Sequence, residues 1–218
     1  MVAGVPQGSP LSPVLFILYI ASLYKALKQE YLLVSIVGFA DDTNLLVFGK
    51  NAIANTQQLE KAWNTCLQWA STRGMAFGAQ KCELIHFNKG RKQWINPGAL
   101  ADPGEGGGYS TVKPVESARF LGVWLDWKLS WKANCHEVER KLKTQDFALS
   151  RLAAKTWGPS LARAREVYVK CIRSAIAYGA SSYHQPIASG EASKPRGPAK
   201  TLSKAQNQSL RIMVGAYK

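Results

Sequence analysis

The spacing of apolar and polar residues divides the chain into a mixed first part and a helical second part. Residues 13–28 are apolar on nearly every side, which predicts a well-buried helix with Ser12 as its N-cap and Pro13 in its first turn. Residues 32–40 and 45–48 are β-prone, so they predict two strands with residues 41–44 at the tip of a hairpin. Residues 54–73 show helical spacing, and Gly74 ends that helix.

The same pattern predicts the elements of the remaining chain. Residues 82–87 and 119–126 are strand candidates, and the Pro- and Gly-rich residues 96–109 predict a flexible surface loop. Beyond Trp127 the spacing is helical over residues 131–155, 160–179 and 201–214, with a Pro/Gly/Ser-rich linker at 185–200. We therefore expect an α+β fold for residues 1–126 and an all-α remainder for residues 127–218.

Charge separates the same two parts. The 218 residues hold 28 Lys+Arg against 14 Asp+Glu, a net charge of +14, and 46% of them are apolar, enough for one or two packed domains. Residues 1–126 have a net charge of +2, whereas residues 127–218 have +12. This asymmetry favours a core or catalytic region attached to one that holds a polyanion, and a solvated basic surface is the alternative.

Cysteines and apolar runs exclude several protein classes. The four cysteines lie at least 16 positions apart, without zinc-finger spacing, so we expect a reduced, intracellular protein that uses them as small core residues. The longest apolar run, residues 14–23, is too short to span a bilayer and lacks the features of a signal peptide. Membrane insertion is therefore not expected.

The strongest chemical signal is the run Phe39-Ala40-Asp41-Asp42. Two adjacent carboxylates at a hairpin tip are not core residues, because burying an unpaired carboxylate costs several kcal/mol. Carboxylates on a rigid hairpin suit the Mg²⁺ ions that assist in-line phosphoryl transfer. The alternative is that this run forms an ordinary polar turn.

In its context this run resembles motif C of the reverse transcriptases of non-LTR (LINE-type) retrotransposons. The run GVPQGSPLSP at residues 4–13 matches their motif B, and residues 74–83 are similar to motif D with its lysine at Lys81. Residues 119–123 resemble the primer-grip motif E, and residues 207–217 resemble the segment that closes the thumb. The resemblance spans essentially the whole chain, and the five motifs follow in the right order.

The resemblance implies a fold and a reaction. The fold is a partial polymerase palm (split β-α-β) over residues 1–126, followed by an all-α basic thumb over residues 127–218. The reaction is RNA-directed DNA synthesis, in which dNTPs are added to a DNA primer on an RNA template with Mg²⁺ (or Mn²⁺). Asp41 and Asp42 are the implied catalytic metal ligands. Lys81 is the implied general acid for pyrophosphate, and an exposed lysine at a strand end is the alternative.

Further residues are implied to contact nucleic acid. The nucleotide and template loop comprises Gln7, Gly8, Ser9 and Pro10, and the primer grip comprises Phe120, Leu121 and Gly122. Basic side chains of the thumb helices can grip phosphates without reading sequence; they are Arg140, Lys141, Lys143, Arg151, Lys155, Arg163, Arg165, Lys170 and Arg173. Four tryptophans near them either stack on bases or form an interface core; they are Trp124, Trp127, Trp131 and Trp157.

The sequence departs from the family pattern at its start. It begins six residues before Gln7, and no Asp precedes Asp41, so the fingers region and the third metal-binding aspartate of motif A are not in it. We therefore expect an incomplete, inactive fragment of a polymerase. The alternative is a non-enzymatic nucleic-acid-binding remnant that acts through its basic C-terminal helices. The family implies an intracellular protein of the nucleus or cytoplasm, and a mitochondrial location stays open because no targeting signal is seen.

Overall fold

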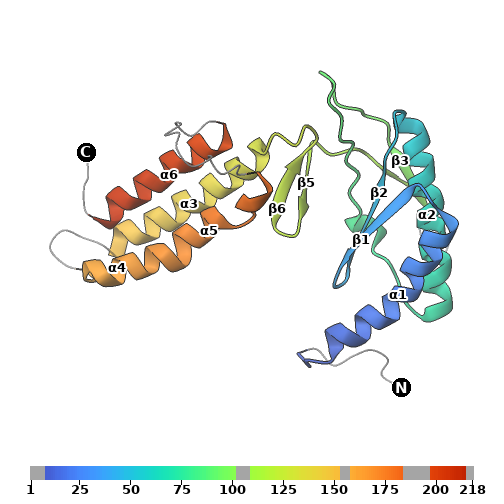
Figure 1. The fold of residues 1–218 in the computed structure, drawn as a ribbon, viewed down its shortest axis with the longest axis horizontal. Coiled ribbons are helices and arrows are strands. Elements are labelled where there is room, and N and C mark those ends of the chain that lie inside the picture. Colours follow the sequence, from blue (N-terminus) through green and yellow to red (C-terminus); the bar gives the residue numbers. More distant parts are fainter. Residues whose placement is uncertain (1–7, 102–108, 153–157, 184–196, 215–218) are drawn as a thin grey trace, which may run out of the picture. The chain divides into compact units, whose positions relative to one another are not determined.

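The protein consists of two structural units, each with its own core (Figure 1). The computed structural model describes residues 8–101, 109–152, 158–183 and 197–214. The first unit contains residues 1–86 and 90–115, and the second contains residues 87–89 and 116–218. Both units combine helices with small antiparallel hairpins, in agreement with the α+β class. The functional boundary between residues 126 and 127 stays a prediction.

The first unit is built on two helices with a hairpin between them in the chain. Helix α1 (Ser12–Glu30) precedes strands β1 (Val34–Phe39) and β2 (Asp42–Val47), and helix α2 (Ala52–Arg73) follows them. A short 3-10 helix, η1 (Ala79–Lys81), and a second hairpin of β3 (Gly98–Ala101) and β4 (Tyr109–Val112) complete the unit.

The capping residues explain where α2 starts and stops, whereas the start of α1 has no side-chain cap. Pro13 lies in the first turn of α1 as predicted, but the N-cap is Leu11 rather than Ser12, and it makes no side-chain cap bond. The N-cap of α2 is Asn51, whose side chain accepts hydrogen bonds from the N–H groups of Ile53 and Ala54. It ends at Gly74, whose φ of 67° is the left-handed conformation that glycine adopts readily. The predicted stop at Gly74 is confirmed.

The core of the first unit shows that α1 is buried along only one stripe. Ile20, Leu23 and Leu27 of α1 pack with Trp63 and Trp69 of α2 in this core. Large apolar side chains in and before the first half of the helix are exposed instead: Leu11, Val14, Leu15, Ile17 and Leu18. The prediction of a helix buried nearly all round is therefore wrong for the described residues, because no described element covers that half.

Several predicted strands differ in the structure. Residues 82–87 form no strand and contribute only an isolated bridge from Leu84 to Pro114. Residues 96–109, predicted as a loop, contain β3 and the start of β4, while residues 102–108 lie outside the described part. Residues 119–126 do not form one strand, because the chain reverses at Leu121 and Gly122 to pair β5 (Ser117–Phe120) with β6 (Val123–Asp126).

The second unit packs helices around its own core. Helix α3 (Lys132–Leu152), helix α4 (Leu161–Val167), a π-helical turn η2 (Tyr168–Arg173) and α5 (Ser174–Ala177) match the predicted helices at 131–155 and 160–179. A 3-10 turn, η3 (Ala180–Ser182), follows, and α6 (Pro198–Met213) matches the last predicted helix. Leu142 and Leu149 of α3, Ile172 of η2 and Leu202 of α6 meet in the core.

The prediction that the cysteines are small core residues holds for two of the four, because Cys82 is half-buried and Cys171 is exposed. All four cysteines are free, and Cys66 and Cys135 are buried. Burial raises the pKa of the Cys66 thiol to about 12, as expected for an inert core residue. No helix in the described residues combines the length and apolar character that crossing a membrane requires.

Candidate functional site

The two aspartates lie at the end of the β1–β2 hairpin. Phe39 pairs with Asp42, so the loop consists of Ala40 and Asp41 alone, and Asp42 is the first residue of β2. The predicted tip at residues 41–44 is therefore displaced: Thr43 and Asn44 belong to the strand. A two-residue loop fits the twist of paired strands, and Ala40 adopts the positive φ of 51° that this loop requires. Both aspartate side chains are exposed.

The hairpin is held on α1 through Tyr24. The Tyr24 hydroxyl and the Thr43 hydroxyl are hydrogen-bonded at 3.0 Å. Tyr24 also lies against Gly38, where an added Cβ would be 2.2 Å from the Tyr24 hydroxyl oxygen. Because Gly38 pairs with Thr43 across the hairpin, the tyrosine fixes both strands just before they reach the aspartates. Sequence analysis missed Tyr24, since nothing in a helical pattern distinguishes it from a core aromatic.

The two faces of the β1–β2 hairpin differ: one packs in the core, and the other is exposed and includes Asp42. Val34, Ile36, Leu45 and Val47 contribute to the core of the first unit. On the opposite face Asp42 stands beside the exposed Phe39, its partner in the register. Alternation of side chains along a strand produces this division, so Asp42 points away from the core.

The two carboxylates at this tip are the kind of ligand that a hard cation such as Mg²⁺ prefers, but two of them are fewer than such an ion needs. Carboxylate oxygens are the ligands that Mg²⁺ takes from proteins. Among the residues that the structure describes, no group of three His, Cys, Asp or Glu side chains is arranged to hold a metal ion. The role of Asp41 and Asp42 as metal ligands therefore stays a prediction, and an ion bound there would need further oxygens.

Lys81 ends the short helix η1 and is exposed. Its backbone N–H donates to the carbonyl of Gly78 at 2.9 Å, which closes the turn. Lys81 is exposed as the alternative states, but it ends a 3-10 turn and not a strand, because residues 82–87 form no strand. Its role as a general acid stays a prediction.

The predicted nucleotide loop leads directly into α1. Gly8 has a φ of 90°, a conformation that side-chain-bearing residues rarely adopt. The Ser9 hydroxyl accepts from the N–H of Leu11 at 3.3 Å, and the Ser9 carbonyl accepts from the N–H of Ser12 at 3.2 Å. These bonds turn the chain into the helix. Gln7 lies outside the described residues.

The predicted primer grip is a tight turn in the second unit. Leu121 and Gly122 form the loop between β5 and β6 with φ values of 47° and 85°, as a type I′ turn requires. The Tyr178 hydroxyl donates to the Leu121 carbonyl at 2.6 Å. The Tyr178 ring also lies close to Gly122, since an added Cβ there would be 3.1 Å from the nearest ring carbon. Tyr178 therefore holds the turn, and sequence analysis gave no signal for it.

The basic side chains of the second unit fall into two groups. Arg140, Lys143 and Lys170 pair with glutamates one turn away on the same helices, at 3.0, 3.5 and 2.5 Å. The others have no ion pair within the described residues; they are Lys141, Arg151, Arg163, Arg165 and Arg173. The Arg151 guanidinium lies over the Phe147 ring, 5.9 Å from its centroid. Lys155 lies outside the described residues.

Three of the predicted tryptophans, Trp124, Trp127 and Trp131, are half-buried. Trp131 packs against Tyr183 with ring centroids 5.3 Å apart, and the Lys128 ammonium lies 4.6 Å from the Trp127 ring centroid. These contacts agree with an interface core at Trp131. Trp157 lies outside the described residues, so base stacking there stays a prediction.

Comparison with known proteins gives one family and several relatives. Residues 1–125 match the family "Reverse transcriptase (RNA-dependent DNA polymerase)". The chain is 25% identical over 186 residues to the RNA-directed DNA polymerase from mobile element jockey of Drosophila melanogaster, an alignment covering 83% of this chain and 19% of that protein. The Drosophila funebris counterpart is 26% identical, with 78% and 18% covered.

A relative from another element supports the same placement. The chain is 23% identical over 187 residues to the retrovirus-related Pol polyprotein from type-1 retrotransposable element R1 of Nasonia vitripennis, covering 84% of this chain and 53% of that protein. The chain thus spans about a fifth of the jockey proteins and about half of the R1 protein. No solved structure matches it. The motif order, the family match over more than half of the chain and these relatives from mobile and retrotransposable elements agree: the chain belongs to the reverse transcriptase family.

Proposed function

We propose that this chain supplies the partial palm (residues 1–126) and the thumb (residues 127–218) of an RNA-directed DNA polymerase, which copies an RNA template onto a DNA primer. The observation that carries the proposal is the pair of exposed aspartates at the end of a hairpin anchored by Tyr24. An exposed acidic tip on a rigid support is what phosphoryl transfer needs, since most of the catalysis comes from positioning and charge. The family match covers this hairpin.

Asp41 and Asp42 would hold the divalent ion, Mg²⁺ or Mn²⁺. When bound, such an ion neutralises the charge that develops on the attacking and leaving oxygens. The hairpin contributes the fixed position of both carboxylates, because Tyr24 clamps Gly38 and Thr43 immediately beside them. Two carboxylates leave several coordination positions to water, so we expect weak metal binding and little polymerisation by these 218 residues alone.

The other site residues have supporting roles in this proposal. The exposed Lys81 ammonium donates a proton to the leaving pyrophosphate. The loop of Gln7, Gly8, Ser9 and Pro10 lines the nucleotide and template. Phe120, Leu121 and Gly122 contact the 3′ end of the primer, and the fixed turn offers a close backbone approach at Gly122. The basic helices of the second unit hold the duplex by its phosphates.

Grafting tests the proposal. The matching residues of the Drosophila melanogaster jockey polymerase are replaced by this chain, and primer extension on an RNA template is measured with Mg²⁺ and with Mn²⁺. We expect the graft to extend the primer and the Asp41→Asn plus Asp42→Asn graft to lose at least about 100-fold in rate, because amides are poor ligands for a hard cation. Glu116→Gln, an exposed acid outside the tip, is the matched control and should leave the rate unchanged.

Other outcomes contradict the proposal. Equal rates with and without the two aspartates would show that the tip takes no part in catalysis. A graft that folds and binds primer and template, yet extends nothing, would favour the non-enzymatic nucleic-acid-binding remnant instead.

A further inference from the structure

Helix α3 has a carboxyl group in the middle of its buried stripe. Leu142 and Leu149 of this stripe are 1% and 2% exposed, and Asp146 lies between them on the same face at 6%. No other Asp, Glu, Lys or Arg among the described residues is buried to this extent. Burying a charge is costly unless it is paired and hydrogen-bonded, so the surroundings of Asp146 decide which protonation state the fold favours.

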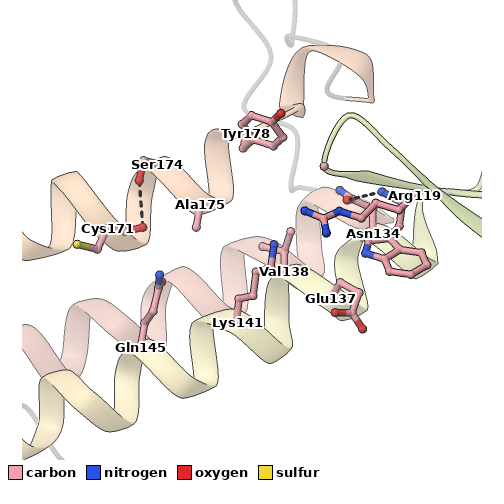
Figure 2. A pocket seen from close by; sticks show the side chains of 12 residues that line it. Arg119, Asn134, Glu137, Val138, Lys141, Gln145, Cys171, Ser174, Ala175 and Tyr178 are labelled. Atoms are coloured by element: carbon pink, nitrogen blue, oxygen red, sulfur yellow. Dashed lines mark hydrogen bonds between the residues drawn. The ribbon is translucent and has the colours of Figure 1, made fainter. Parts of the chain in front are cut away.

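Asp146 is enclosed between α3 and α6. Another side of α3 borders a cavity of 590 Å³, and Figure 2 shows Lys141 and Gln145 on that side, toward η2 and α5. Asp146 is not part of the lining of this cavity. Its hydrogen-bonding neighbour is Ser209 of α6, whose side chain is fully buried in the same unit.

The hydrogen bonds around this carboxyl group suit its protonated form. Oδ1 of Asp146 is buried without a hydrogen-bond partner in the described residues. The Ser209 hydroxyl has a single proton, which it donates to the Ala205 carbonyl at 3.2 Å. An ionised Asp146 only accepts, so it competes with that carbonyl for the proton. A protonated Asp146 donates to the Ser209 oxygen instead, and the bond to Ala205 is kept.

No cation compensates for a charge on Asp146. The elements that pack against α3 are α6, η2, α5 and β6, and α5 has no titratable side chain. The titratable side chains of the other three elements, and Lys143 one turn away on α3, form no ion pair with Asp146. Those of the three elements are Lys200, Lys204 and Arg211 of α6, Tyr168, Lys170, Cys171 and Arg173 of η2, and Asp126 of β6.

We propose that Asp146 is a pH-sensitive contact between α3 and α6, in which the uncharged acid keeps α6 packed in the core of the second unit and ionisation weakens that packing. The proposal goes beyond the proposed function, because none of the site residues named there takes part in the contact. It concerns a conformational change of the second unit that needs no metal, nucleotide or nucleic acid.

The direction of the pH effect follows from the surroundings of the carboxyl group. Burial raises the pKa of Asp146, and the hydrogen bond with Ser209 lowers it in part. A folded-state pKa above the unfolded one means that the stabilising contribution is complete below the ordinary carboxyl pKa of about 3.9 and is lost as the pH rises through the raised value. Acidification should therefore tighten α6, which is the reverse of the usual effect of acid on a paired carboxylate.

Hydrogen exchange of the α6 amides in the full chain, followed by mass spectrometry, tests the proposal. The natural chain and Asp146→Asn are compared at the same pH, so the intrinsic pH dependence of exchange cancels. At about pH 7.5 we expect α6 to exchange at least about 5-fold more slowly in Asp146→Asn, which stays uncharged and keeps a donor for Ser209. The ratio should approach 1 as the pH is lowered toward about 4, where the natural carboxyl group becomes protonated.

A matched control separates this effect from a general effect of removing a carboxylate. Glu139→Gln removes a carboxylate of the same helix that is paired with Lys143 at 3.5 Å. It should not slow the exchange of α6 at any pH in this range. Asp146→Leu removes the charge and the unpartnered oxygen together, so it should also slow the exchange at about pH 7.5, and it serves as the second variant if Asp146→Asn does not fold.

Three results would overturn the proposal. One is a ratio between Asp146→Asn and the natural chain that does not change with pH. Another is α6 exchange in the natural chain that is as slow as in both variants at about pH 7.5. The third is an α6 without protection at every pH. Because the measurement uses neither primer nor metal, these results leave the polymerase proposal untouched, and a graft that extends no primer leaves this one untouched.

Discussion

At the residue scale, the position of the aspartates depends on two small residues of the hairpin. Gly38 leaves room for Tyr24, and Ala40 supplies the positive φ of the loop although it carries a Cβ. The left-handed conformation costs a residue with a Cβ about 1–2 kcal/mol, a cost that glycine escapes. The hairpin therefore has a glycine where space is needed and an alanine where conformational freedom is needed.

Separate substitutions of Gly38 and Ala40 should have different effects on the free energy of unfolding. In Gly38→Ala the new methyl group would meet the Tyr24 hydroxyl, so we expect a loss of about 1–3 kcal/mol in the free energy of unfolding. In Ala40→Gly the relief of strain is offset by the added chain entropy, so we expect no change or a gain of up to about 1 kcal/mol. Urea unfolding measures both.

A double-mutant cycle shows whether Tyr24 is the cause. In a Tyr24→Ala background the penalty of Gly38→Ala should largely disappear, because the colliding ring is gone. A penalty that persists without the ring would mean that the hairpin itself, and not its contact with α1, rejects a side chain at position 38.

At the element scale, α1 and the β1–β2 hairpin leave apolar surface uncovered. Leu18 is 68% exposed, Leu15 is 48% exposed, and Phe39 on the outer hairpin face is 60% exposed. Within the described residues β1 and β2 pair only with each other, so each also has an open edge. Apolar patches beside open strand edges favour self-association. Figure 1 shows the first half of α1 extending beyond the hairpin.

We expect the 218-residue chain to self-associate through this surface. Sedimentation velocity at increasing concentration should show a rising sedimentation coefficient, and Leu15→Gln plus Leu18→Gln should reduce it without lowering the melting temperature, since neither side chain is buried. Ala21→Gln, an exposed position of the same helix, is the control and should leave association unchanged. A chain that stays monomeric throughout would contradict the expectation.

At the scale of the whole molecule, net charge is concentrated in one part of the sequence. Residues 127–218 hold +12 of the total +14. The structure divides these cations further, because some pair with glutamates of their own helix while Arg163, Arg165 and Arg173 have no ion pair within the described residues. Unpaired cations are free to replace counterions on a nucleic acid, so they should dominate binding.

Nucleic-acid affinity should fall steeply with salt and show little sequence preference. Changing Arg163, Arg165, Lys170 and Arg173 to Gln should reduce the slope of log K against log salt by about 3, with Lys170 contributing least because it is paired with Glu166. Changing Lys25, Lys28, Lys50 and Lys61 to Gln removes the same charge from the near-neutral part and is the control. Equal slopes for the two quadruple variants would contradict a phosphate-binding role for the helical unit.

The sequence by itself determined the long elements, the family and the acidic tip. Long helices such as α2 and α3 follow from apolar spacing sustained over many turns, with a local stop such as Gly74. The Asp41-Asp42 pair and the order of the motifs are also local in the chain, and the comparisons confirmed the family they indicate. Local patterns are sufficient here because the signal lies within the segment that carries it.

Tertiary structure alone decided which surfaces are covered and which residues hold the sites. The apolar residues of α1 have similar character all round the helix, but only the stripe with Ile20, Leu23 and Leu27 packs in the core with α2, while Leu15 and Leu18 stay exposed. The reversal at Leu121 needed positive φ at a leucine, where Tyr178, 57 positions away, bonds the turn. The role of Tyr24 at the aspartate hairpin is likewise defined by its partners Gly38 and Thr43 on other elements, because burial and hydrogen bonding depend on what folding brings alongside.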